Sequence, residues 1–207
     1  MDISPLLSLD PKTLEKRYRE REAFCEPSRP PAAVRLDGVG FGKRLKDFPP
    51  PRSALVHAAM VETARLLAAT YGADYAYTVS DEINLIFLDA VPHGGRTFKI
   101  ITVLASHAAA HLSTKLTRPL HFDGRVIKLE NKCDVAKYIL YRARIGLNNY
   151  VIQIARANGL LNSHTPPITQ LIKQVKIDYE LAIGTLLTKP QKYAPTTPLQ
   201  AEELCQH

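Results

Sequence analysis

The sequence predicts an α+β fold in which helices cover one face of an antiparallel sheet. Runs rich in β-branched and aromatic residues lie near residues 32–41, 75–87 and 122–129, and segments with apolar residues at helical spacing separate them. The predicted order is therefore strand, helix, strand, strand, helix, strand. This is the order of the ferredoxin-like arrangement, which we expect over residues 32–130.

The composition indicates a basic globular protein with a sizeable core. Of the 207 residues 45% are hydrophobic, and 27 Lys and Arg against 20 Asp and Glu give a formal charge of +7, which favours a polyanionic partner. No apolar run reaches the roughly 18 residues of a membrane span. Residues 1–9 lack a signal-peptide pattern, so we expect a cytoplasmic protein. Cys25, Cys133 and Cys205 form no metal or disulfide motif and are expected to be reduced.

The N-terminal segment, residues 1–31, is predicted to form a charged outer helix and a proline-rich approach to the sheet. Asp10 can cap a helix over residues 10–26, with Pro11 at its first position. The prolines that follow end this helix and favour an extended backbone that leads into the first strand.

Two long helices are predicted to pack on the sheet. Residues 53–71 have helical apolar spacing and stop at Gly72, a plausible C-cap, and residues 97–117 form a second, alanine-rich helix. His107 and His111 lie four residues apart on this second helix. We interpret them as packed, hydrogen-bonded histidines and not as a metal pair, because no third ligand is apparent nearby.

Residues 75–87 predict a β-hairpin with Ser80, Asp81 and Glu82 at its turn. Taken alone, the adjacent carboxylates fit a solvated acidic turn as well as they fit a cation site. Asp37 favours the second interpretation, because it ends the first strand and can face Asp81 across the sheet. Such a pair is the minimal ligand set for two-metal phosphoryl transfer.

A glycine-rich loop follows Asp37. It matches neither the P-loop nor the dinucleotide-binding pattern. Its backbone amides and Lys43 can cradle triphosphate oxygens, although a flexible surface loop explains the same residues. Gly38 would let its own carbonyl oxygen approach a metal ion.

The C-terminal part is predicted to be helical over residues 131–187, with a long helix over residues 134–161 that bends near Gly146. Cations and tyrosines are interleaved along this region, as suits an RNA backbone and stacked bases, although core packing also explains each helical tyrosine. Residues 188–207 are rich in Pro and Thr and are expected to form a flexible tail.

Several short motifs, in this order and spacing, resemble those of the tRNA-His guanylyltransferase family and its guanylyltransferase-like relatives. The resemblance extends over roughly residues 21–187. The motifs are Val34-Arg35-Leu36-Asp37-Gly38, Ser80-Asp81-Glu82, Arg96 with Lys99, Phe122-Asp123-Gly124-Arg125-Val126, and Asn148-Asn149. The family adds nucleotides to the 5′ end of tRNA, in the direction opposite to ordinary polymerases, from a palm domain.

The resemblance implies two Mg²⁺ ions, GTP and ATP as substrates, tRNA-His or 5′-truncated tRNA as partner, no membrane, and a homotetramer. The implied catalytic residues are Asp37, Asp81 and Glu82, and the implied metal ligands are Asp37, Gly38 and Asp81. With the glycine loop included, the expected nucleotide contacts are Gly38, Val39, Gly40, Phe41, Gly42, Lys43, Ser80, Asp81, Arg96 and Lys99. With the basic region included, the expected tRNA contacts are Arg125, Lys128, Lys137, Arg142, Asn148 and Asn149.

The chain departs from the family pattern at Val39 and Gly42, where the family usually has Arg and His. It also lacks the family's His just before the paired asparagines, because Gly146 and Leu147 precede Asn148. These departures concern the ATP-dependent activation step more than nucleotidyl transfer. They suit repair of 5′-truncated tRNA, or use of triphosphorylated ends, at least as well as guanylylation of tRNA-His.

Two other classes of function remain open. A palm-type nucleotide cyclase or dinucleotide synthase would also need Asp37 and Asp81, but it would not need a basic surface for tRNA. A catalytically inactive RNA-binding relative would keep the fold without needing either carboxylate.

Overall fold

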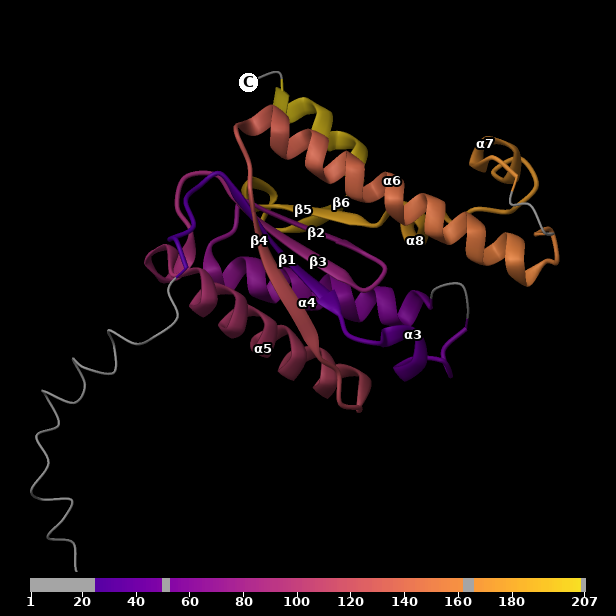
Figure 1. Cartoon of the computed structure of the whole chain (residues 1–207), viewed down its shortest axis with the longest axis horizontal. Helices are drawn as coiled ribbons and strands as arrows, with labels where there is room; N and C mark the ends of the chain where they lie inside the picture. The colour runs from indigo at the N-terminus through magenta and orange to yellow at the C-terminus, as the bar shows by residue number, and fades with distance from the viewer. Residues whose placement is uncertain (1–24, 50–52, 162–165, 206–207) are drawn as a thin grey trace, which may run out of the picture.

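Six antiparallel strands form one sheet in this computed structural model, which describes residues 25–49, 53–161 and 166–205 (Figure 1). The helix predicted over residues 10–26 lies almost entirely outside the described residues. The strands are β1 Ala32–Gly38, β2 Tyr75–Val79, β3 Glu82–Phe87, β4 Phe122–Lys128, β5 Thr185–Thr188 and β6 Ala194–Thr196, in the spatial order β4-β1-β3-β2-β5-β6. The first four confirm the ferredoxin-like order, and β5 and β6 extend the sheet beyond β2.

Helices lie on both faces of the sheet. The long ones are α4 Ala54–Tyr71, α5 Thr97–Leu116 and α6 Lys132–Ala157, and the short ones are α3 Phe41–Arg44, α7 Ile168–Leu171, α8 Tyr179–Ile183 and the 3₁₀ turns η1 Pro92–Gly95, η2 Lys189–Gln191 and η3 Pro198–Cys205. Figure 1 shows α4 and α5 beneath the sheet and α6 across its other face. Within the described part of the chain, no helix is both long and apolar enough to span a membrane.

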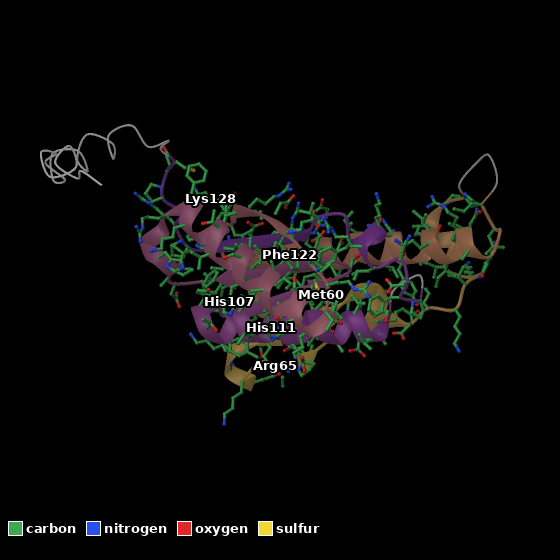
Figure 2. All side chains as sticks on the ribbon, turned by 90° about the horizontal axis from the view of Figure 1, so that it is seen from below. Met60, Arg65, His107, His111, Phe122 and Lys128 are labelled. Atoms are coloured by element: carbon green, nitrogen blue, oxygen red, sulfur yellow. A yellow bond between two sulfur atoms is a disulfide. The ribbon has the colours of Figure 1, made fainter. Side chains whose placement is uncertain are left out.

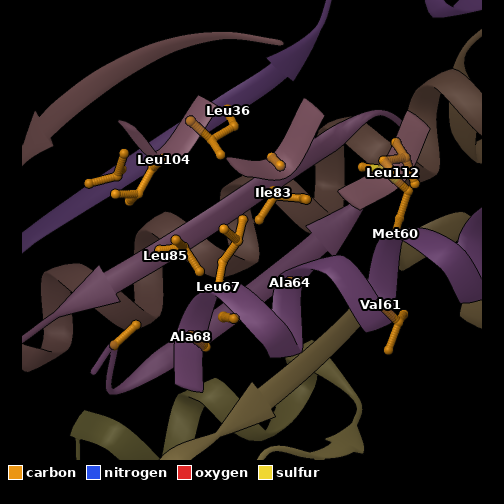
Figure 3. Close-up of a cluster of buried hydrophobic side chains, with 14 of the residues drawn as sticks. Leu36, Met60, Val61, Ala64, Leu67, Ala68, Ile83, Leu85, Leu104 and Leu112 are labelled. Atoms are coloured by element: carbon orange, nitrogen blue, oxygen red, sulfur yellow. The ribbon is translucent and has the colours of Figure 1, made fainter. Parts of the chain in front are cut away.

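The α4/α5 face holds the larger hydrophobic core. Leu36 of β1 and Leu85 of β3 meet Leu67 of α4 and Leu104 of α5, all with no exposed surface (Figure 3). These strand residues alternate with others that point to the opposite face. Full burial of such side chains stabilises the fold by about 1.5–3 kcal/mol each.

The second face is covered by α6, where helices were expected on one face only. Ala33, Tyr77 and Ile86 pack there against Val135 and Ile139 of α6. The central strands are therefore apolar on both sides, as strands buried between two layers are. The long helix itself is confirmed, although it ends at Ala157.

The C-terminal segment corrects the expectation of a flexible tail, because residues 188–205 pack against the rest of the structure. Strand β6 pairs with β5, and Tyr193 Oη donates to the carbonyl oxygens of Ala68 and Ala73 at 3.2 and 2.7 Å. Ala201 of η3 is fully buried against the α6 layer. Proline and threonine suggested a tail, but the few apolar residues between them supply these contacts.

Cys133 and Cys205 lie close enough to be paired as a disulfide, where both were expected to be reduced. Their Cα atoms lie 4.6 Å apart because η3 runs beside the start of α6. Cys25 is free and exposed, as expected.

The two histidines of α5 confirm the packing interpretation. Figure 2 shows His107 and His111 on successive turns of this helix. His107 Nδ1 lies 3.0 Å from the Tyr71 hydroxyl, and His111 Nδ1 lies 2.9 Å from Thr63 Oγ1. Both partners belong to α4, so the histidines join the two helices.

Replacing Gly146 by Ala should destabilise the protein by about 1–3 kcal/mol, because a methyl group there overpacks the α6 contact with the sheet. A Cβ at this position would overlap Val79 and lie 2.9 Å from the Ala182 carbonyl oxygen. Thermal unfolding measures the effect, with Gly42→Ala as control because nothing lies within 4 Å of its added Cβ. Equal melting temperatures for the two variants would contradict the close packing.

Candidate active site

The pairing of β1 with both of its neighbours brings three carboxylates together. Asp37 lies opposite Glu82 of β3 and opposite Asp123 of β4. Directly opposed residues of antiparallel strands share a face, with their Cβ atoms roughly 5 Å apart. All three side chains therefore point to the α6 face at one end of the sheet.

The β2–β3 turn adds Asp81 to this cluster. Ser80 has a φ of 57°, in the left-handed region that tight hairpin turns require. The backbone N–H of Gly38 donates to the carbonyl oxygen of Asp81 at 2.9 Å. This bond fastens the turn to the end of β1, so the structure brings Asp37, Gly38, Ser80 and Asp81 together as the motifs predicted.

Asp37 has the electrostatic signature of a site that favours cations. Burial is the largest cause that raises the pKa of its carboxyl, and the negative charges of Asp81, Glu82 and Asp123 raise this pKa further. The positive charge of Arg35 lowers it. Crowded carboxylates repel one another unless a cation neutralises them.

The donors fit Mg²⁺ as it binds in phosphoryl-transfer sites. Among the described residues no group of three or more Asp, Glu, His or Cys side chains is arranged to hold a metal. Magnesium commonly uses one or two carboxylates together with waters and substrate phosphates. Asp37, Asp81 and the Gly38 carbonyl oxygen suit an ion that is bound together with a triphosphate.

Glu82 lies in this cluster, but its carboxylate is paired with Arg142. Arg142 Nε donates to Glu82 Oε2 at 3.0 Å, and Arg142 Nη2 contacts Oε1. Both side chains are largely buried, at 9% and 13% exposure. The prediction that Arg142 contacts tRNA is wrong, because its guanidinium faces inward from α6.

The glycine loop forms a tight turn held by a buried aromatic ring. Gly40, with φ 67°, begins the single turn α3, and the Phe41 ring is buried against Phe122 with centroids 5.2 Å apart. A Cβ on Gly38 would lie 2.6 Å from that ring, so only glycine fits. The side chain of Phe41 is therefore core, whereas Val39, Gly42 and Lys43 are exposed.

A cavity of about 460 Å³ opens beside Asp81. It is lined by Phe41, Gly42, Leu45, Lys46, Phe48, Pro49, Ser53, Val56, His57, Ser80, Asp81 and Gln153. Its volume lies within the range of small-molecule pockets. Half of its lining residues are polar or charged, and the others are apolar or glycine.

Phe48, His57 and Gln153 are among the lining residues that were not predicted from the sequence. His57 is buried, with Nε2 2.9 Å from Thr185 Oγ1 of β5. A single histidine or glutamine in an amphipathic helix gives no signal of a site. Only the packing of α4 and α6 around the hairpin turn brings these residues together.

Arg118 fixes the loop that forms the rim of this cavity. Its Nη1 donates to Asp47 Oδ1 at 2.6 Å and to the Arg44 carbonyl oxygen at 3.0 Å. Its guanidinium also lies 4.8 Å from the centre of the Phe48 ring. Three contacts from one side chain hold residues 44–48 in place.

Arg96 and Lys99 lie apart from Asp37 and Asp81. They sit at the start of α5, where the Ser28 N–H donates to the Gly95 carbonyl oxygen at 2.7 Å. Residue 28 precedes β1, whereas Asp37 lies at its far end. Asp37 points to the α6 face, whereas α5 covers the other face, so the structure does not bring these two cations to the carboxylates. Their contact with nucleotide stays a prediction.

The remaining expected tRNA contacts are spread over two elements. Arg125 and Lys128 are exposed on the edge strand β4, and Arg125 has Asp123 3.7 Å away. Lys137 and Asn149 are exposed on α6. Asn148 is half-buried, and its Oδ1 has no hydrogen-bond partner among the described residues.

Replacing Asp37 by Asn should stabilise the metal-free protein at neutral pH. The raised pKa means that the folded state holds this proton more tightly than the unfolded chain does. The stability that this bound proton contributes is therefore present below the ordinary pKa of 3.8. It is lost as the pH rises through the pKa of Asp37 in the folded protein. We expect a gain on the order of 0.5 kcal/mol at pH 7, after solvent screening.

Thermal unfolding in a chelator at pH 7 and near pH 3.5 checks this expectation. The gain should vanish at the lower pH, and Mg²⁺ with nucleotide should favour the wild type. A melting temperature for Asp37→Asn at or below the wild type at pH 7 would contradict carboxylate crowding.

Replacing Arg118 by Met should weaken nucleotide binding about five- to tenfold, because the rim of the cavity loses its charged anchor. Fluorescence titration with a labelled GTP analogue measures the affinity. Lys115→Met is the control, since Lys115 pairs with Glu62 between α5 and α4. If both variants bound the GTP analogue equally well, the rim of the cavity would have no part in nucleotide binding.

Comparison with known proteins supports the assignment from geometry. Residues 15–137, more than half of the chain, match the family model of tRNAHis guanylyltransferase (Thg1). Uncharacterized protein R259 of Acanthamoeba polyphaga mimivirus is 25% identical over 162 residues, which cover 62% of this chain and 56% of that protein. The chain thus spans a little over half the length of this curated relative.

Solved structures of the family have the same fold. A bacterial Thg1-like protein in complex with ATP gives a TM-score of 0.79 at 24% identity, covering 93% of this chain and 95% of that one. A bacterial Thg1-like protein in complex with GTP gives 0.72 at 26% identity, over 86% and 83%. The tRNA(His) guanylyltransferase of Saccharomyces cerevisiae gives 0.65 at 15% identity, over 87% and 94%. The carboxylate register, the palm-like sheet and the family match agree, and this chain belongs to the tRNAHis guanylyltransferase family.

Proposed function

We propose that this protein is a metal-dependent nucleotidyltransferase that adds nucleotides, preferably from GTP, to the 5′ end of tRNA in the 3′–5′ direction. The observation that carries the proposal is the placement of Asp37 and Asp81 at the end of β1, beside a cavity of about 460 Å³. Family membership supports the reaction class, and the relatives in complex with ATP and GTP support the choice of substrates.

In this proposal Asp37, Asp81 and the Gly38 carbonyl oxygen hold two Mg²⁺ ions. When bound, the ions make the attacking hydroxyl more nucleophilic and stabilise the charge of the departing pyrophosphate. Lys43 and the exposed amides of the glycine loop contact the triphosphate. The nucleotide base enters the cavity, where Phe48 offers an aromatic face.

The accepting RNA approaches over the exposed cations and the polar face of α6. Arg125, Lys137 and Asn149 are accessible to phosphates and bases. We expect this contact to weaken steeply with salt, since Lys and Arg displace counterions from RNA.

The proposed assembly follows from the resemblance, and the proposed location is the one expected in the sequence analysis. We propose a cytoplasmic homotetramer whose tRNA crosses subunits. In such an assembly Arg96 and Lys99, which are exposed and distant from Asp37 of their own chain, remain available to phosphates bound elsewhere.

The substrate end is proposed to be a 5′-truncated or triphosphorylated tRNA. Val39 and Gly42 carry no cation and no imidazole, which the family usually has at these positions. Val39 is 45% exposed, and nothing lies within 4 Å of a Cβ added to Gly42. Transfer to a triphosphorylated end needs no activation by ATP, because the pyrophosphate leaving group is already present.

Incorporation assays on truncated tRNA transcripts test both parts of this proposal. Transfer onto 5′-triphosphate ends is expected to exceed transfer onto 5′-monophosphate ends supplied with ATP. The reverse preference would contradict the choice of end. No incorporation on either end, or on intact tRNA-His, would favour the cyclase or the RNA-binding alternative.

Asp37→Ala and Asp81→Ala should each reduce transfer by about 10³-fold while the fold is retained, because each removes a ligand whose ion stabilises the transition state by several kcal/mol. Asp89→Ala is the matched control, since Asp89 is exposed beyond the far end of β3. Transfer that survives either change at saturating Mg²⁺ would contradict the ligand assignment.

A further inference from the structure

The ion pair between Arg142 and Glu82 is the one buried pair of opposite charges that touches the carboxylate cluster among the described residues. Arg142 has 7% of its surface exposed, and its guanidinium meets both oxygens of Glu82. A two-point contact of this kind fixes the direction of a carboxylate as well as its charge. Glu82 lies directly opposite Asp37 on β3, so its direction matters to the site.

A second contact, one helical turn away, holds α6 against the same strand. Tyr138 donates from its hydroxyl to Asn84 Oδ1 at 2.7 Å, and Asn84 is fully buried. Residues 138 and 142 share a face of α6, and residues 82 and 84 share a face of β3. Burial raises the pKa of Tyr138 to about 12, so this donor keeps its proton throughout the physiological range.

The charges near Asp37 show what the pair accomplishes. Three further carboxylates, Asp81, Glu82 and Asp123, lie close enough to Asp37 to act on its carboxyl. Arg142 cancels the charge of one of them. The remaining carboxylates, Asp37, Asp81 and Asp123, then suit ions that are bound together with substrate phosphates. They do not suit ions whose ligands all come from the protein.

We infer that Arg142 is a positioning residue of the metal site, which holds the Glu82 carboxylate away from the ions and neutralises its charge. Glu82 is then not a metal ligand in this protein. The inference rests on the proposed function only in taking Asp37 and Asp81 as the metal ligands. It assigns α6 a part in the chemistry, because this helix sets the charge that the ions meet.

Mn²⁺ affinity, measured by electron paramagnetic resonance with GTP and without RNA, tests the inference independently of transfer. Arg142→Gln frees the charge of Glu82 and should tighten Mn²⁺ binding about three- to tenfold. Glu82→Gln leaves the Arg142 cation unopposed and should weaken binding by a similar factor. The double variant removes both charges and should bind Mn²⁺ within about twofold of the wild type.

The double variant is decisive, and it is also the variant that should fold best. Removing one member of a buried pair leaves an uncompensated charge, whereas removing both is often nearly neutral for stability. If Glu82 were a ligand, the double variant would lose about tenfold or more in affinity, as Asp81→Asn should. That loss would overturn the inference.

Arg144→Gln controls for the loss of a positive charge on α6, because Arg144 is exposed two residues away. Its Mn²⁺ affinity should match the wild type, and an effect as large as that of Arg142→Gln would overturn the specific role of the pair. A wild-type protein that binds no Mn²⁺ would contradict the proposed metal site and this inference together. Normal wild-type binding that the double variant loses would contradict this inference alone.

Discussion

The hydrogen-bond register of β1 is the constraint on which the site depends. This strand lies between β3 and β4 and opposes Asp37 to Glu82 on one side and to Asp123 on the other. A shift of one residue would turn Asp37 into the α4/α5 core and bring Leu36 to the polar face. Leu36 is fully buried in that core, so the hydrophobic packing that stabilises the sheet also holds the carboxylates in line.

Local sequence patterns predicted the elements that residues close in sequence determine. Strand alternation and helical spacing predicted the first four strands and the helices between them, and the two acidic positions followed from where strands end. Contacts between distant segments were not predictable in this way. Thr185 meets His57, and Arg142 meets Glu82, across 128 and 60 residues of chain. No local pattern of residues marks such partners.

Strand direction explains why Arg96 and Lys99 do not lie beside Asp37 although their motif was identified. Strand β3 begins at the hairpin turn and runs away from Asp37, so η1 and the start of α5 lie at the opposite end of the sheet. Helix α5 then returns, and Phe122 at the start of β4 pairs beside Gly38. A motif gives the type of residue, but the path of the chain determines which end of the sheet each residue reaches.

The late position of β5 in the chain has a consequence for how the protein is made. Strand β5 pairs with β2 across more than 100 residues of sequence, and such long-range pairings form slowly because a large loop must close first. As the chain leaves the ribosome, the acidic end of β1 can assemble from residues 32–128 alone. The partner of His57, and α6 with its counter-charge for Glu82, come later in synthesis. A nascent chain therefore holds its carboxylates before it holds a finished cavity, while the sheet face that α6 later covers is still open.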